Sequence, residues 1–200
     1  MKEPCIHIVG AGPGDPELLT LKGRRLLEEA DLVLYAGSLV NREILACCRE
    51  DARLADSAPL SLEEQVDLLT EAARDGKRVV RLHTGDPSLY GAIGEQIRLL
   101  EDRGIRVRIV PGVSSLQGAA AALGVEYTVP GGTQTLICTR APGRTPVREE
   151  ESLTALAATG ATLAVFLSAE HAAAVAASCL KGGLSPATPA AWSPGWSGTA

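Results

Sequence analysis

The chain has 200 residues, of which 46% are hydrophobic and 22% are charged, and its formal net charge is −5 at pH 7. That length is enough to bury a sizeable core in one large domain or two small ones. The negative charge argues against nucleic acid, or an anionic membrane surface, as the main partner. The aromatic residues are one Phe, three Tyr and two Trp, too few to build a platform on which bases stack.

The five cysteines, at positions 5, 47, 48, 138 and 179, form no C-x-x-C motif. An odd number without that spacing argues against a disulfide framework or a zinc site, and it favours a reducing compartment. No apolar run reaches the roughly 18 residues that a membrane span needs. The N-terminus leads directly into a strand pattern and shows no signal peptide. We therefore expect a cytoplasmic protein that does not bind membranes and has no metal site.

In its first part the chain alternates short β-branched runs with amphipathic segments. We predict strands over 6–9, 32–35, 53–55, 79–82 and 107–110, and helices over 18–29, 39–48, 62–74 and 91–103. Ser61 and Glu64 have the spacing of a capping box at the start of the third helix. The alternation predicts a mostly parallel α/β sheet covered on both faces. Right-handed crossovers place the loops that follow its strands on one edge.

The pattern changes near residue 112, and we predict two domains, 1–112 and 113–200. Ser114 is the expected N-cap of an alanine-rich helix over 115–123. Beyond it we predict strands over 134–139 and 162–168, a possible last strand over 188–192, and helices over 149–158 and 170–180. The residues after 192 contain Pro, Gly and Trp without a period, which is typical of a segment that packs poorly.

Four glycine-containing loops follow strands of the first domain. They are Gly10-Ala-Gly-Pro-Gly-Asp15, Tyr35-Ala-Gly-Ser38, Thr84-Gly-Asp-Pro-Ser-Leu-Tyr-Gly91 and Pro111-Gly-Val-Ser-Ser115. In open α/β sheets ligands bind outside the carboxyl ends of the strands. Backbone groups and short hydroxyl side chains that converge there predict a cleft for a small polar ligand.

The first loop does not fit the dinucleotide fingerprint G-x-G-x-x-G, because its third glycine comes one residue early. Pro13 also removes a backbone donor that a pyrophosphate would use, and Asp15 would repel a phosphate. This argues against a nicotinamide-dependent oxidoreductase. None of the four loops contains Lys or Arg, which favours a ligand without phosphates. S-adenosylmethionine is one such ligand.

Five ordered blocks resemble the tetrapyrrole (corrin/porphyrin) methylase family. They are the block from Gly10 to Thr20, Leu34-Tyr-Ala-Gly-Ser-Leu-Val40, Thr84 to Gly91, Val110 to Ser115, and Thr139-Arg140. The second and third blocks are similar to the branch that methylates carbon 11 of precorrin-4 or cobalt-precorrin-4 in cobalamin biosynthesis. The resemblance covers about residues 6–180. It implies two α/β domains, the first with a mostly parallel sheet and the second with a mixed sheet, a cleft between them, and a homodimer.

The resemblance also implies S-adenosylmethionine as the cofactor and a tetrapyrrole as the substrate. The residues at the family's cofactor positions are Pro13, Thr84, Gly85, Asp86, Leu89, Ser114, Ser115, Leu167 and Ala191. Ser38, Tyr90 and Arg140 are candidates for substrate contact, and Arg140, Arg144 and Arg148 are candidates for binding substrate carboxylates, although a solvated loop explains them equally well. Family members continue into further strands beyond 188–191, so we expect an open sheet edge and weaker cofactor binding here.

Several alternatives stay open. Asp86 either orients the cofactor and acts in catalysis, or it only closes an Asx turn before the next helix. His83 is either a proton shuttle or a hydrogen-bonded strand residue. At the level of function, the alternatives are a tetrapyrrole methylase that acts at another ring position and a degenerate cofactor-binding protein without turnover.

Overall fold

The computed structural model describes residues 3–37, 39–143 and 146–192. Ser38, Arg144 and the tail from residue 193 therefore lie outside the described residues. The chain divides after Gly118 into two compact units, which are described here one at a time. No helix among the described residues has the length and apolar character to cross a membrane.

The first unit is built on a five-stranded parallel sheet with the strand order β3-β2-β4-β1-β5. The strands are β1 (Cys5–Gly10), β2 (Leu32–Tyr35), β3 (Arg53–Asp56), β4 (Val79–His83) and β5 (Arg106–Val110). All five predicted strands are present, each within two residues of its expected bounds. Every strand runs in the same direction, so all the loops that follow the strands leave from one edge of the sheet.

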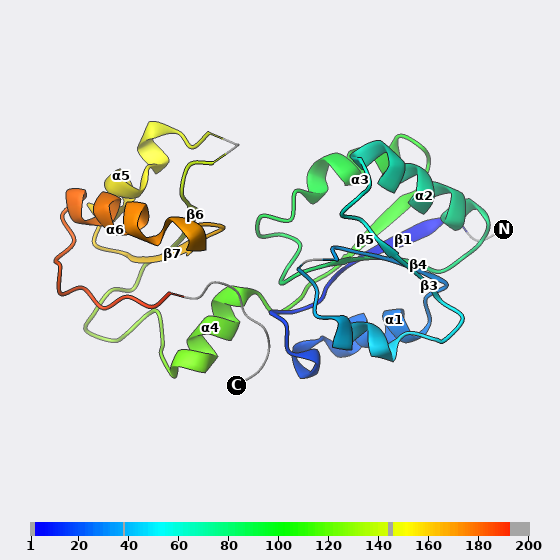
Figure 1. Cartoon of the computed structure of the whole chain (residues 1–200), viewed down its shortest axis with the longest axis horizontal. Coiled ribbons are helices and arrows are strands. Elements are labelled where there is room, and N and C mark those ends of the chain that lie inside the picture. Colours follow the sequence, from blue (N-terminus) through cyan, green and yellow to red (C-terminus); the bar gives the residue numbers. More distant parts are fainter. Residues whose placement is uncertain (1–2, 38, 144–145, 193–200) are drawn as a thin grey trace. The chain divides into compact units, whose positions relative to one another are not determined.

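Helices cover both faces of this sheet, and each face has its own apolar core. On one face lie α1 (Leu21–Glu28) and a 3₁₀ helix, Arg42–Cys47, and the core there includes Val9, Leu27 and Ile44. On the other face lie α2 (Leu62–Arg74) and α3 (Ile93–Glu101), over a core that includes Leu69 and Leu100. Figure 1 shows α1 on the side of the sheet opposite to α2 and α3.

The helix starts follow from their capping residues. The capping box at α2 is confirmed: the Ser61 hydroxyl accepts a hydrogen bond from Glu64 N, and Glu64 accepts one from Ser61 N at 2.7 Å. Thr20 caps α1 by accepting from Gly23 N at 3.1 Å. The helix predicted over 18–29 therefore begins later, at Leu21, and a separate 3₁₀ turn, Pro16–Leu18, precedes it.

Two further helices of the first unit are shorter than predicted. The segment predicted as a helix over 39–48 is the 3₁₀ helix Arg42–Cys47, because Asn41 caps it only at that point by accepting from Glu43 N. Helix α3 begins at Ile93 rather than Gly91, because Tyr90 (φ 57°) and Ala92 (φ 50°) have left-handed backbone conformations that a right-handed helix excludes.

Helix α4 (Ser115–Leu123) has the predicted bounds, and the second unit begins within it, at Ala119. It contains strands β6 (Leu136–Arg140) and β7 (Thr162–Phe166), helix α5 (Leu153–Ala157) after a 3₁₀ turn over Glu149–Glu151, and α6 (Ala172–Lys181). Helices α5 and α6 are linked by a hydrogen bond from Thr154 Oγ1 to Ser178 O at 3.3 Å.

Two expectations for the second unit need correction. Strands β6 and β7 pair in parallel, so among the described residues the sheet is a parallel pair and not the mixed sheet that we expected. The possible strand over 188–192 is absent: these residues have no regular secondary structure. Pro189 removes a backbone donor from this segment, which weakens any pairing that it could make.

Candidate functional site

The candidate site lies at the carboxyl edge of the first sheet, where the loops after β1, β2, β4 and β5 leave the strands. The parallel pairing brings Gly10 at the end of β1 beside His83 at the end of β4, and Val9 beside Val110. The predicted convergence of these loops is confirmed for the ends of these strands.

The loops after β1 and β4 are joined through their backbones. Ala11 N donates to His83 O at 2.6 Å. Gly12 and Gly85 exchange two hydrogen bonds, Gly12 N to Gly85 O at 3.2 Å and Gly85 N to Gly12 O at 2.7 Å. Gly12 has a φ of 80° and Gly85 a φ of 60°, conformations that side chains disfavour. Glycine at these two positions therefore allows the loops to form a short antiparallel pair above the sheet.

The loop after β5 packs against the same backbone. A Cβ atom placed on Gly112 would lie 2.2 Å from Gly85 O and 2.8 Å from Gly10 Cα. These neighbours are backbone atoms of two other segments, and backbone atoms cannot move aside as the end of a flexible side chain can. The absence of a side chain at Gly112 is what lets the three loops meet.

Asp86 binds two loops together through its carboxylate. Oδ2 accepts from Gly112 N at 2.9 Å, and Oδ1 accepts from Ser88 N at 2.8 Å and from the Ser88 hydroxyl. Burial acts to raise the pKa of Asp86, but the hydrogen bonds from Ser88 and Gly112 outweigh it and hold the pKa below its usual value. The Asx turn that we considered is present, and the bond to Gly112 gives Asp86 a second role in positioning the loop over 111–115.

The other candidates of the first unit differ in exposure. Pro13 is buried, and its ring packs on Gly118, where an added Cβ would lie 3.0 Å from Pro13 Cβ and Cγ. Ser114 is buried, and its hydroxyl caps α4 as predicted by accepting from Leu116 N at 3.3 Å. Thr84 and Ser115 are exposed, and Leu89 is half-buried. Thr84 and Ser115 thus present hydroxyl groups to solvent, while Pro13 and Ser114 support the loops.

Two residues that the sequence reasoning missed shape the loop after β2. Asp56, at the end of β3, accepts at Oδ1 from Gly37 N at 3.0 Å and from Ala58 N at 2.8 Å. Asn41 donates from Nδ2 to Gly14 O at 2.9 Å and so ties this loop to the loop after β1. Neither residue lies in a glycine loop motif, and their roles depend on neighbours distant in sequence.

A buried charge lies below the site. Arg81 is 6% exposed, and its Nη1 donates to Leu34 O at 3.2 Å and Leu82 O at 3.3 Å. Burial lowers the pKa of Arg81 to about 10, against the attraction of Asp56. Burial and, secondarily, the charge of Arg81 lower the pKa of His83 to about 4. His83 is therefore neutral at pH 7, and its Nε2 has no hydrogen-bond partner among the described residues, which argues against the proton shuttle.

The second unit holds the remaining candidates. Leu167 follows β7, has a φ of 53° and is 76% exposed. Arg140, at the end of β6, donates to Pro146 O at 3.3 Å. Ala191 is exposed, and its neighbour Trp192 donates from Nε1 to Ala169 O at 2.8 Å. That bond brings the segment of Ala191 close to the turn that follows Leu167.

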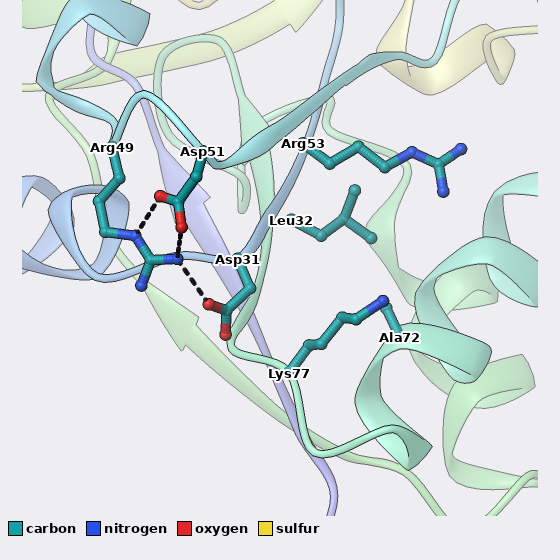
Figure 2. A pocket seen from close by; sticks show the side chains of 7 residues that line it. All are labelled: Asp31, Leu32, Arg49, Asp51, Arg53, Ala72 and Lys77. Atoms are coloured by element: carbon teal, nitrogen blue, oxygen red, sulfur yellow. Dashed lines mark hydrogen bonds and ion pairs between the residues drawn. The ribbon is translucent and has the colours of Figure 1, made fainter.

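A shallow pocket of about 300 Å³ lies elsewhere and does not belong to the candidate site. Its lining includes Asp31, Leu32 and Arg53, at the amino ends of β2 and β3, opposite to the loops described above. Figure 2 shows Arg49, another lining residue, paired with Asp31 and Asp51. Each of these ion pairs has an N···O distance of 2.9 Å. Among the described residues no group of three or more His, Cys, Asp and Glu side chains is arranged to hold a metal ion.

Comparisons with known proteins agree with these observations. The family model of Tetrapyrrole (Corrin/Porphyrin) Methylases matches residues 5–193. A cobalt-precorrin-4 C(11)-methyltransferase of Methanocaldococcus jannaschii is 52% identical over 186 residues, which are 93% of this chain and 72% of that protein.

Two solved structures are also similar. The X-ray structure of a cobalamin biosynthetic enzyme, cobalt precorrin-4 methyltransferase, has a TM-score of 0.88 and 49% identity, and the match covers 92% of this chain and 77% of that one. Uroporphyrin-III C-methyl transferase from Thermus thermophilus, complexed with S-adenyl homocysteine, has a TM-score of 0.73 and 32% identity, with coverage of 90% and 73%.

Proposed function

Because the chain belongs to the tetrapyrrole (corrin/porphyrin) methylase family, we infer that it is a methyltransferase acting at carbon 11 of cobalt-precorrin-4 or precorrin-4 in cobalamin biosynthesis. The observation that carries this assignment is the 52% identity to a C11-methyltransferase over 93% of the chain. The uroporphyrin-III C-methyl transferase, whose name gives a different macrocycle, is only 32% identical to this chain. The difference favours carbon 11 over another ring position.

We propose S-adenosylmethionine as the methyl donor. The four loops at the carboxyl edge supply backbone groups, hydroxyl groups and the carboxylates of Asp15 and Asp86, and they contain no Lys or Arg, so they fit a ligand that carries no phosphate. The uroporphyrin-III enzyme that resembles this chain was solved with the demethylated product, S-adenyl homocysteine. The residues proposed to hold the cofactor are Pro13, Thr84, Gly85, Asp86, Leu89, Ser114, Ser115, Leu167 and Ala191.

In this reaction the main task of the protein is to position the substrate relative to the methyl donor. When bound, the sulfonium of the cofactor supplies an activated methyl group. The loops must hold the reacting ring carbon in line with the bond that breaks, and such orientation is worth on the order of 7–11 kcal/mol of barrier. Asp86 serves this placement by holding Gly112 and Ser88. We propose that Asp86 acts as a positioning residue for the loops as well as a neighbour of the cofactor.

We propose that the macrocycle contacts Ser38, Tyr90 and Arg140. Tyr90 is 38% exposed in the strained loop before α3, and strained backbone is concentrated at binding sites. Arg140 offers a guanidinium to substrate carboxylates, which pair with such groups in a bidentate way.

The remaining proposals concern organisation. We propose that 1–112 forms a domain carrying the cofactor and substrate loops, and that 113–200 completes the site. We also propose a homodimer, as the resemblance implies, and a cytoplasmic location, in keeping with five free cysteines. Light scattering on purified protein tests the dimer: a mass near twice the chain's 20.8 kDa is expected, and a mass near that of a single chain contradicts it.

The test of the function is incubation of the protein with cobalt-precorrin-4 or precorrin-4 and S-adenosylmethionine carrying a ¹³C-labelled methyl group, followed by NMR of the product. The label is expected at carbon 11. A label at another carbon would overturn the position, and S-adenosylhomocysteine binding without turnover would favour the degenerate binding protein. A parallel titration with NADH should show no binding, because the first loop lacks the dinucleotide spacing.

A further inference from the structure

The turn after β7 combines two unfavourable features in one residue. Leu167 has a φ of 53°, and left-handed backbone costs a residue with a Cβ roughly 1–2 kcal/mol. Its side chain is also 76% exposed, so it gains little from burial in its own unit. A strained, exposed apolar residue persists only where neighbouring structure imposes it, and such residues concentrate at binding sites.

The neighbouring residue that imposes this conformation is Ser168. Its side chain is 5% exposed, and its hydroxyl donates to Phe166 O at 2.7 Å and accepts from Ala141 N at 2.9 Å. Phe166 ends β7 and pairs with Arg140 at the end of β6. The hydroxyl therefore links the ends of both strands and closes a turn in which Leu167 is the residue in between.

Both hydrogen bonds of the hydroxyl are partly shielded from solvent. Without the hydroxyl, Ala141 N loses this acceptor, and the loss of a hydrogen bond at a partly buried donor is costly. We expect the turn then to relax and Leu167 to leave the left-handed region.

We propose that Ser168 is a positioning residue for the methyl-transfer site: its hydroxyl holds Leu167 in the strained conformation in which Leu167 meets the cofactor. This inference rests on the proposed function, since it takes Leu167 as a cofactor contact. Nothing in the sequence motifs of the glycine loops assigns a role to Ser168. The two hydrogen bonds hold Leu167 in its left-handed conformation.

The test is a double-mutant cycle on the whole chain, with the dissociation constant of S-adenosylhomocysteine measured by calorimetry. Ser168→Ala is expected to weaken binding on the order of tenfold. Leu167→Gly removes both the apolar contact and the strain, so it should weaken binding while leaving the thermal midpoint unchanged or higher. In the Leu167→Gly background, Ser168→Ala should cause no further loss of affinity, because the hydroxyl acts through Leu167.

Ser178→Ala is the matched control. It removes a serine hydroxyl of the same unit that donates only to Ala174 O of its own helix, at 2.9 Å, and it should leave the affinity unchanged. Ser168→Thr keeps the hydroxyl and should restore at least part of the affinity lost in Ser168→Ala. In turnover assays Ser168→Ala should raise KM for the cofactor more than it lowers kcat.

The binding measurements distinguish a failure of the proposed cofactor from a failure of the inference about Ser168. If the unaltered protein does not bind S-adenosylhomocysteine, the proposed cofactor is wrong. If the unaltered protein binds and Ser168→Ala only lowers the thermal midpoint, with the dissociation constant unchanged, Ser168 has a structural role alone and the inference is wrong. Equal losses from Ser168→Ala in both backgrounds would also overturn it.

Discussion

Replacing Gly112 with alanine tests the central feature of the site, the contact of three loops through bare backbone. The added Cβ would lie 2.2 Å from Gly85 O, 2.8 Å from Gly10 Cα and 2.9 Å from Gly10 C. All three distances are under the 3.0 Å that real Cβ atoms respect. Gly10 is held by the pairing of β1 with β4, and Gly85 is held by its two hydrogen bonds with Gly12.

The cost follows from which atoms must move. Overpacking of a well-packed site typically costs about 1–3 kcal/mol when side chains can adjust. Here only backbone can adjust, and the shift would also strain the bond from Gly112 N to Asp86 Oδ2 at 2.9 Å. We therefore expect Gly112→Ala to lower the free energy of unfolding by about 3 kcal/mol or more, and to weaken binding of S-adenosylhomocysteine.

The assay is urea unfolding followed by circular dichroism, with a calorimetric titration of S-adenosylhomocysteine on the same samples. Gly94→Ala is the matched control, because a Cβ on Gly94 in α3 would meet no atom within 4 Å. That variant should gain about 0.5–1 kcal/mol from the lower backbone entropy of its unfolded chain. If Gly112→Ala unfolds within about 0.5 kcal/mol of the unaltered protein, the loops do not meet as described and the reasoning is refuted.

Three further predictions follow from single residues. Burial lowers the pKa of His83 from 6.5 to about 4 in the folded protein. Between these two pH values the unfolded chain therefore binds more protons than the folded chain. The free energy of unfolding should fall as the pH drops from 6.5 towards 4, by up to about 3 kcal/mol. In urea titrations at pH 7 and pH 5, His83→Gln should reduce that fall and the surface variant His171→Gln should not; equal falls in all three proteins would contradict the assignment. Ala92→Gly should increase the free energy of unfolding by about 0.5–1 kcal/mol and so raise the thermal midpoint, because Ala92 has a φ of 50° at the start of α3. A lower midpoint would show that no backbone strain is stored at Ala92. Ser61→Ala should cost about 1 kcal/mol in urea unfolding because it removes the capping box of α2, and a change below about 0.3 kcal/mol would mean that the box contributes little.

The local features of the chain could be predicted from the sequence because each depends on residues close to one another. Strand β2 has the predicted bounds Leu32–Tyr35, and Ser61 and Glu64 form the predicted capping box three residues apart. The glycine loops were placed correctly at the carboxyl edge, since alternation of strands and helices determines that parallel strands end together. The family was likewise evident from the blocks at 84–91 and 110–115.

Other features were decided by contacts between residues far apart in the sequence. Asp86 accepts from Gly112 N across 26 positions, Asn41 donates to Gly14 O across 27, and Ser168 binds Ala141 N across 27. Neither hydrophobic periodicity nor secondary-structure propensity predicts partners so far apart in the sequence. From the sequence alone, Asp86, Asn41 and Ser168 therefore resemble ordinary turn or cap residues.

The same reason explains the errors in secondary structure. The segment over 39–48 has the composition of an α-helix, but it forms a 3₁₀ helix that begins only after Asn41. The side chain of Asn41 is fixed there by its hydrogen bond to Gly14 O. Helix α3 begins late because the loop before it places Tyr90 and Ala92 in left-handed conformations. Sequence by itself therefore determined the order of the elements and the edge of the sheet at which the candidate site lies. The tertiary structure alone decided which side chains tie the loops together, because hydrogen bonds and close backbone approach depend on distance in space and not on distance along the chain.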